Sequence, residues 1–145
     1  MFTGSYNRAL DAKGRLLLPQ NFLQTLSEDN ENRTFWITSF YGRLTAYKAG
    51  QWEKIVEKLC SLSLPSIRLS NFISKIIGLA HELTPDGQGR IRIPQPLMRD
   101  AGISREIVIV GIMNKFEIWD QERFDGIALE DVSMELVNSG IDITL

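Results

Sequence analysis

A ten-residue motif occurs twice in this chain. Residues 11–20 read DAKGRLLLPQ, and residues 86–95, which lie 75 positions further on, read DGQGRIRIPQ. The Asp, Gly, Arg, Pro and Gln residues match in register, and aliphatic residues match at Leu16/Ile91 and at Leu18/Ile93. Such a match indicates that the chain arose by duplication, so both halves should fold in the same way.

The motif has the pattern of a tight turn that leads into a strand. The carboxylates of Asp11 and Asp86 can accept hydrogen bonds from backbone N–H groups of the turn. Gly14 and Gly89 can adopt the positive φ angle that such a turn requires. In the second copy the apolar side chains alternate with arginines, which is typical of a half-buried strand.

The match between the halves continues beyond the motif. Helical spacing of apolar residues follows each copy, and after a three-residue insertion residues 35–38 correspond to 107–110 and residues 44–47 to 116–119. Tyr41-Gly42 and Met113-Asn114 then connect paired strands as hairpin turns. Each half is therefore predicted to contain four strands and two helices, which gives an α+β fold.

The predicted organisation is one globular unit over residues 1–145. It comprises a first repeat (4–50), a helical connection (51–79), a second repeat (80–123), and a C-terminal helix and tail (124–145). A half of this size buries too little surface to be stable alone, so the repeats should share one core. The final segment is predicted to form a helix with Leu129, Val132, Leu136 and Val137 on one face, followed by alternating residues up to Leu145.

Charge is distributed unevenly along the chain. The net charge is −2, but residues 1–116 carry 15 bases and 10 acids, and the acids concentrate after Glu117. A basic body with an acidic tail is compatible with binding to phosphate. No apolar run is long enough to span a membrane, and the N-terminus does not resemble a signal peptide, so we expect a cytoplasmic protein without membrane contact.

Residues suited to catalysis or to metal binding are scarce. His81 is the only histidine and Cys60 the only cysteine, so a histidine-based metal cluster or a catalytic triad is not expected. Cys60 follows Leu59 in a helical pattern, which favours a structural thiol. An enzyme acting on a nucleotide or a cell-wall precursor would need a titratable pocket around His81 or Asp86. We therefore expect neither an enzyme nor a cofactor.

The basic residues near the motif are the best candidates for a binding site. Arg8, Lys13 and Arg15 cluster around the first copy, and Arg90 occupies the same place in the second. Arginine suits bidentate contact with guanine or phosphate, and lysine suits phosphate. Alternatively, Arg15 and Arg90 form ion pairs with Asp11 and Asp86 that only brace the turns. This alternative does not apply to Lys13, because Gln88 replaces it in the second copy.

The opening MFTG, the paired Asp-x-x-x-Arg motifs and the segment VGIMNKFEIWD (110–120) closely resemble the MraZ family of bacterial transcriptional regulators. The resemblance covers essentially the whole chain. It implies a pseudo-twofold, swapped-hairpin β-barrel of two AbrB-like (SpoVT-AbrB) repeats flanked by helices, and self-association into a ring. It also implies binding to direct repeats in the promoter of the division and cell-wall gene cluster, usually as a repressor associated with the nucleoid.

In the resembling family the motif arginine and the adjacent basic turn residue contact DNA. They correspond here to Arg15 and Lys13, with Arg90 related to Arg15 by the repeat. In a ring, many weak contacts with DNA would together give strong binding. The alternative function is an oligomeric scaffold that binds another protein and makes no direct contact with DNA.

Overall fold

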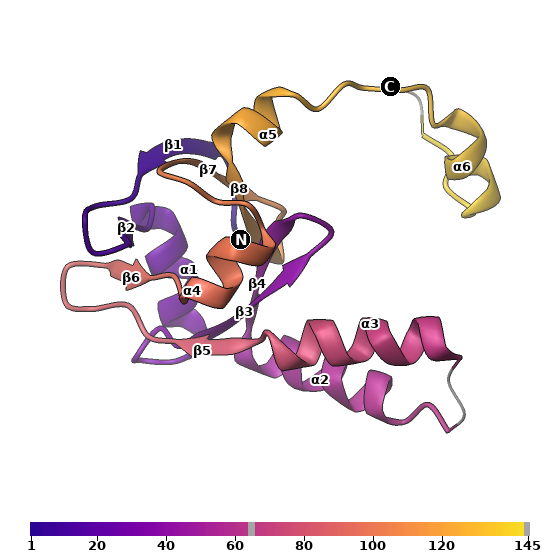
Figure 1. Cartoon of the computed structure of the whole chain (residues 1–145), viewed down its shortest axis with the longest axis horizontal. Coiled ribbons are helices and arrows are strands. Elements are labelled where there is room, and N and C mark those ends of the chain that lie inside the picture. The colour runs from indigo at the N-terminus through magenta and orange to yellow at the C-terminus, as the bar shows by residue number, and fades with distance from the viewer. Residues whose placement is uncertain (64–65, 144–145) are drawn as a thin grey trace.

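The computed structural model describes residues 1–63 and 66–143. The strands are β1 (Ser5–Ala9), β2 (Arg15–Leu17), β3 (Phe35–Phe40), β4 (Arg43–Lys48), β5 (His81–Leu83), β6 (Arg90–Arg92), β7 (Glu106–Gly111) and β8 (Lys115–Asp120). The helices are α1 (Gln20–Asp29), α2 (Ala49–Cys60), α3 (Ile67–Gly78), α4 (Gln95–Asp100), α5 (Gln121–Asp125) and α6 (Ser133–Asn138). The predicted α+β class is confirmed (Figure 1).

The two repeats exchange their first strands. The main sheet is six-stranded with the order β1-β7-β8-β4-β3-β5, and β2 and β6 form a separate two-stranded sheet. Strand β1 of the first repeat thus pairs with β7 of the second, while β5 of the second repeat pairs with β3 of the first. Neither repeat holds its complete set of strand partners without the other.

Strand register preserves the symmetry of the duplication. Leu16 lies opposite Ile91 in the two-stranded sheet, and these residues occupy equivalent places in the two motifs. Thr45 lies opposite Glu117 between β4 and β8, and these residues are also equivalent. A pseudo-twofold axis relating the repeats therefore passes through both pairs.

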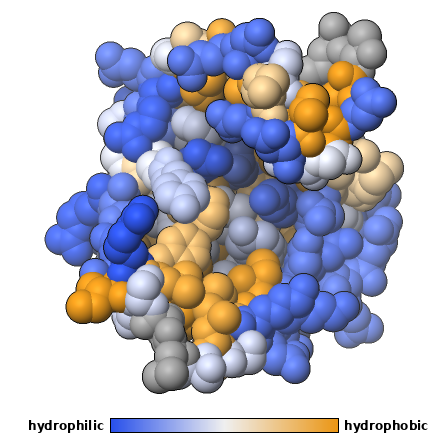
Figure 2. Space-filling view, turned by 90° about the vertical axis from the view of Figure 1, so that its right-hand side faces the viewer, coloured by the Kyte–Doolittle hydropathy of each residue, from blue (hydrophilic) through white to orange (hydrophobic). Residues whose placement is uncertain are grey.

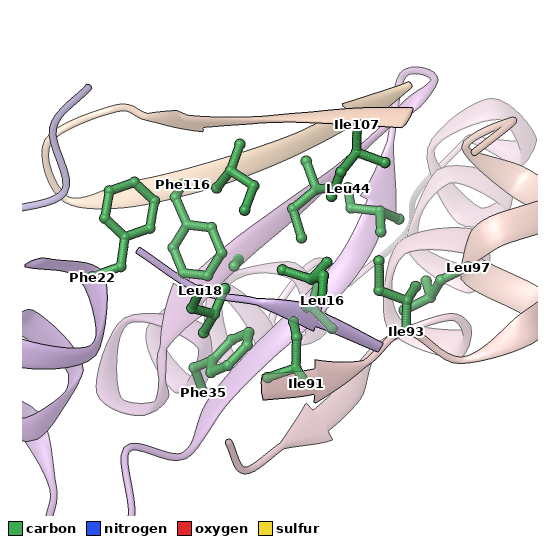
Figure 3. Packing of buried hydrophobic residues seen from close by; sticks show 14 of the residues in the cluster. Leu16, Leu18, Phe22, Phe35, Leu44, Ile91, Ile93, Leu97, Ile107 and Phe116 are labelled. Carbon is green, nitrogen blue, oxygen red and sulfur yellow. The ribbon is translucent and has the colours of Figure 1, made fainter. Parts of the chain in front are cut away.

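The core fills the space between the sheets, and both repeats contribute to it. Phe116 of β8 packs against Phe2, Phe22 and Phe35, with ring centroids 5.1 to 5.4 Å apart, and all four side chains are fully buried. The inward residues of β2 and β6 lie beside this aromatic cluster (Figure 3). Burial of each large side chain contributes roughly 1.5–3 kcal/mol, so the shared core dominates stability.

Two antiparallel helices, α2 and α3, lie between the repeats and extend from the body (Figure 1). The Ser66 side chain caps α3 by accepting a hydrogen bond from the backbone N–H of Leu69 at 3.2 Å. Cys60 is exposed at the end of α2, so the expectation of a structural thiol is wrong. Leu64 and Pro65, in the predicted break between the halves, lie outside the described residues.

The end of the chain differs from the single amphipathic helix that the pattern predicted. Helix α5 ends at Asp125, and α6 begins only at Ser133. Leu129 lies between them and is 97% exposed, so it is not part of a helical face. Leu129, Val132 and Val137 of the predicted face are all exposed. The last two residues of the predicted alternating tail lie outside the described residues.

Candidate nucleic-acid interface

The two-stranded sheet of β2 and β6 presents one face to the core and the other to solvent. Leu16 and Ile91 point inward and are buried. On the outward face Arg15 lies opposite Arg92, and Leu17 lies opposite Arg90. This face, called the arginine ribbon and comprising Arg15, Leu17, Arg90 and Arg92, therefore carries three cations around one apolar side chain.

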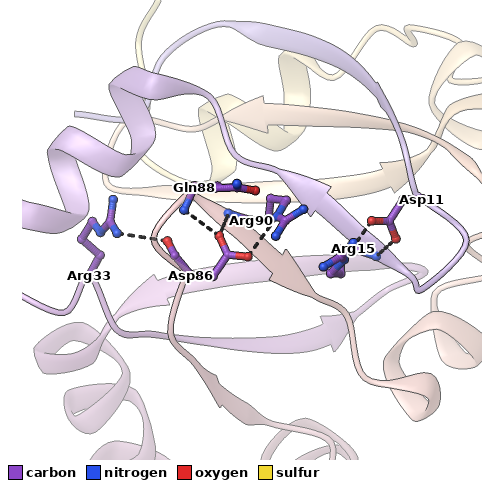
Figure 4. A network of polar contacts seen from close by, with 6 residues as sticks. All are labelled: Asp11, Arg15, Arg33, Asp86, Gln88 and Arg90. Atoms are coloured by element: carbon purple, nitrogen blue, oxygen red, sulfur yellow. Dashed lines mark hydrogen bonds and ion pairs between the residues drawn. The ribbon is translucent and has the colours of Figure 1, made fainter.

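Each strand of the ribbon starts from a tight turn that its aspartate organises. In the first turn (11–15), one oxygen of Asp11 accepts hydrogen bonds from the backbone N–H groups of Lys13 and Arg15, both at 2.9 Å. The other oxygen accepts from Nε of Arg15 at 2.8 Å (Figure 4). Gly14 has a φ of +75°, as the turn requires.

The second turn (86–90) repeats this geometry. Asp86 accepts from the backbone N–H groups of Gln88 and Arg90 and from Nε of Arg90, all at 2.9 Å. Gly89 has a φ of +83°. Arg15 and Arg90 therefore both form the ion pairs that brace their turns. The two turns lie at opposite ends of the antiparallel ribbon.

Both aspartates are more acidic than usual. The pKa of Asp11 is lowered chiefly by the hydrogen bond from the backbone of Arg15, and the pKa of Asp86 is lowered in the same way by Arg90. A carboxylate whose pKa is lowered by folding stabilises the fold at pH values above its unfolded pKa of about 4. That contribution is lost as the pH falls through the lower pKa of the folded state.

We expect the double substitution Asp11→Asn and Asp86→Asn to flatten the acid limb of the stability profile. Asparagine can still accept the backbone hydrogen bonds, but it carries no charge that protonation could remove. Urea unfolding of both proteins between about pH 2 and pH 6 would measure the difference. Identical pH dependence in the two proteins would contradict the role of the paired carboxylates.

Turn bracing leaves the outer part of each arginine free. Each ion pair uses Nε, and among residues 1–63 and 66–143 the terminal guanidinium nitrogens of Arg15 have no hydrogen-bond acceptor. Its side chain is 28% exposed. Arg15 is thus held rigidly while its remaining donors face outward, beside the like-charged Arg92. An anion placed between the two would relieve their repulsion.

A groove of about 670 Å³ opens beside the first turn. It lies between that turn and the start of α4, and the cationic side chains lining it are Lys13, Arg92 and Arg105. Asp11 is the acidic residue in the lining, and its charge is already paired with Arg15. We call this cavity the basic groove. The arrangement suits a phosphate chain better than a neutral ligand.

The second turn has the same backbone but fewer cations. Gln88 stands where the first turn has Lys13, and Leu17 stands where the basic groove has Arg92. Because both turns have the same hydrogen bonds, folding does not require the extra charges of the first. A function located at the first turn would explain them.

Arg105 and Arg33 occupy equivalent positions in the two repeats, but their side chains make different contacts. The Arg33 side chain donates to the backbone carbonyl of Asp86 at 3.2 Å and so supports the second turn. Arg105 lines the basic groove instead. Sequence reasoning missed Arg105 because it precedes a strand, far from the motif. Alignment of position 105 with position 33 in the second part of the repeat could have pointed to it.

Two other residues considered from the sequence, Arg8 and His81, are not among the residues that line the basic groove. Arg8 lies on the edge strand β1, stacked over Tyr6 at 5.5 Å and donating to the carbonyl of Asn7 at 3.1 Å. Nδ1 of His81 lies 2.8 Å from the carbonyl oxygen of Leu79 in a half-buried position.

Within the described parts of the chain, there is no group of three potential metal ligands. No helix there is long and apolar enough to cross a membrane.

Comparison with known proteins agrees with the resemblance. A family model described as "MraZ protein, putative antitoxin-like" matches residues 1–69 and 76–140. This chain belongs to the MraZ family. A protein of Nitratidesulfovibrio vulgaris (strain Miyazaki F), named transcriptional regulator MraZ, is 40% identical over all of this chain and 99% of its own length. A Clostridium acetobutylicum protein of the same name is 35% identical over 86% of this chain and 84% of its own.

Family membership indicates a transcription regulator, since these relatives carry that name. The MraZ family match covers both repeats, including both turns. The two matched segments correspond to the two halves of the duplication.

Proposed function

We propose that this chain regulates transcription by binding promoter DNA through its first turn and its basic groove. Arg15 reads a base edge or a phosphate, Lys13 contacts phosphate at the tip of the turn, and Arg92 and Arg105 extend the contact. Arg8 and Arg90 supply further contacts with DNA. The observation that carries the proposal is the excess of cations at one of two turns that otherwise share the same hydrogen bonds.

The finer features of the family complete this proposal. We infer that the exchanged strands close into the swapped-hairpin barrel of AbrB-like repeats, which would hold the first turn rigidly. The chain forms a ring that binds direct repeats upstream of the division and cell-wall gene cluster, as a repressor associated with the nucleoid. Once one subunit has bound DNA, binding by its neighbours in the ring is effectively intramolecular, so several weak contacts together give a high affinity. Footprinting on the DNA upstream of its own gene tests this, with protection at regular intervals expected.

Salt dependence offers a sharper test of the phosphate contact. The logarithm of the affinity should fall steeply with the logarithm of salt concentration, and Lys13→Gln should reduce that slope by about 1 per engaged chain. Gln88 occupies the equivalent place in the second turn, so the substitution should leave the fold intact. Fluorescence anisotropy on duplex DNA at several salt concentrations measures the slope. An unchanged slope would contradict the proposed contact between Lys13 and phosphate.

The alternative function is a scaffold that binds another protein and not DNA. The exposed apolar residues of the C-terminal segment are the observation that favours it. Absence of a shift with promoter DNA, together with a stoichiometric protein partner, would support the scaffold over the regulator.

A further inference from the structure

The end of the chain carries an unusual amount of exposed apolar surface. Residues 126–143, called the C-terminal arm, extend away from the body beyond α5 (Figure 1). The exposed large apolar side chains of the arm are Ile127, Leu129, Val132, Met134, Val137, Ile141 and Ile143. Leu129 is 97% exposed and Val137 65% exposed. A contiguous segment of this kind usually marks an interaction site.

The arm is also acidic. Residues 126–143 contain four carboxylates (Glu130, Asp131, Glu135 and Asp142) and no lysine or arginine. A surface that covers the arm should therefore be apolar at its centre and basic at its edge.

The body of the same chain offers such a surface. Phe40, Tyr41 and Phe72 form a cluster, called the aromatic patch, with ring centroids 4.4 to 6.3 Å apart. Tyr41 is 72% exposed at the tip of the β3–β4 turn. Figure 2 shows that apolar side chains are exposed on the face of the molecule that carries the helical connection and the end of the chain. The patch is thus open to solvent.

Cations surround the patch. Arg68 lies one helical turn before Phe72 on α3, and Lys75 lies one turn after it. Arg123 donates to the backbone carbonyl of Gly42 at 2.8 Å, beside Tyr41. Lys75 is paired with Asp100, but within the described residues no carboxylate lies within 4.0 Å of the Arg68 or Arg123 guanidinium. The rim of the patch therefore complements the charge of the arm.

We propose that the arm of one copy docks on the aromatic patch of a second copy. The two surfaces are complementary in apolarity and in charge, and one chain carries both. The chain's own arm leaves Tyr41 exposed, so the contact forms between copies. Because the two surfaces differ, the contact is head-to-tail, and its repetition generates a closed ring or a filament.

This inference rests on the self-association included in the proposed function and names the surfaces that produce it. It does not depend on contact with DNA, because none of the residues of the arm or the patch lies at the first turn or the basic groove.

Two full-length variants test the contact. The arm variant carries Leu129→Asp and Val137→Asp, which place charge on exposed apolar positions. The patch variant carries Tyr41→Asp and Arg68→Glu. Tyr41 has a φ of +49°, a conformation that Asp tolerates better than most residues, so the variant should fold. Circular dichroism checks the fold of each protein.

Light scattering after size-exclusion chromatography should find an oligomer for the unmodified chain and a monomer for each variant. An equimolar mixture of the two variants should form a 1:1 heterodimer, because one intact arm meets one intact patch. Ile67→Asp is the matched control: Ile67 is 80% exposed on α3 but lies on a different side of the helix from Phe72, so its oligomer should persist.

The other outcomes overturn the inference in distinguishable ways. A monomeric unmodified chain would refute self-association itself. Variants that remain oligomeric, or monomeric variants that fail to form a heterodimer when mixed, would refute the pairing of arm and patch while leaving self-association in place.

Discussion

Arg15→Ala is expected to reduce the affinity for promoter DNA by about 10- to 100-fold per engaged chain, because it removes a bidentate contact with DNA. Arg90→Ala should reduce it by only a few-fold. The two arginines make the same ion pair with the aspartate of their turn, at 2.8 and 2.9 Å. They differ in their neighbours, because only the first turn opens onto the basic groove. Fluorescence anisotropy with a promoter duplex measures both affinities.

The equivalence of the two turns supplies the control for this experiment. Each substitution removes the same hydrogen bond and the same charge, so both variants should lose a similar, small amount of stability in urea unfolding. A difference in DNA affinity can then not be attributed to loss of fold. Equal losses of affinity would instead mean that the ribbon as a whole, and not the first turn, makes the contact.

Phe116→Ala is expected to lower the free energy of unfolding by about 3–5 kcal/mol, the usual cost of removing a buried phenylalanine. Phe116 is fully buried and packs on aromatic residues of the first repeat and the N-terminus. Phe116→Leu keeps most of the volume and should cost less than about 1.5 kcal/mol. Urea denaturation followed by circular dichroism measures both variants.

Unfolding of these variants should remain a single transition. The exchange of β1 and β5 leaves each repeat without its strand partners when the other unfolds. A variant that showed two separate transitions would contradict the shared core.

Much of the fold could be predicted because the duplication aligns two independent samples of the same pattern. The strand alternation of Ile91 and Ile93 and the turn role of Asp11 and Asp86 are confirmed. The exchange of β1 and β5 could not be derived from local patterns. A strand has the same alternation whichever repeat provides its partner, so pairing is decided by tertiary packing.

The site was predictable only in part. Lys13 and Arg15 stand in a motif, whereas Arg105 reaches the groove because α4 and β7 bring it beside the first turn. The end of the chain was wrongly predicted as one amphipathic helix. Periodicity shows how apolar residues are spaced, but it does not show whether another surface covers them. Leu129 shows this most clearly, being apolar, in the expected phase and almost fully exposed.

Site-specific crosslinking tests the central claim most directly. In a chain with Cys60→Ser, a photoreactive group attached through Lys13→Cys or Gln88→Cys samples the two equivalent turns separately. We predict efficient crosslinking of promoter DNA from position 13 and little from position 88. Equal crosslinking from both positions, or crosslinking from position 88 alone, would contradict the assignment of DNA contact to the first turn.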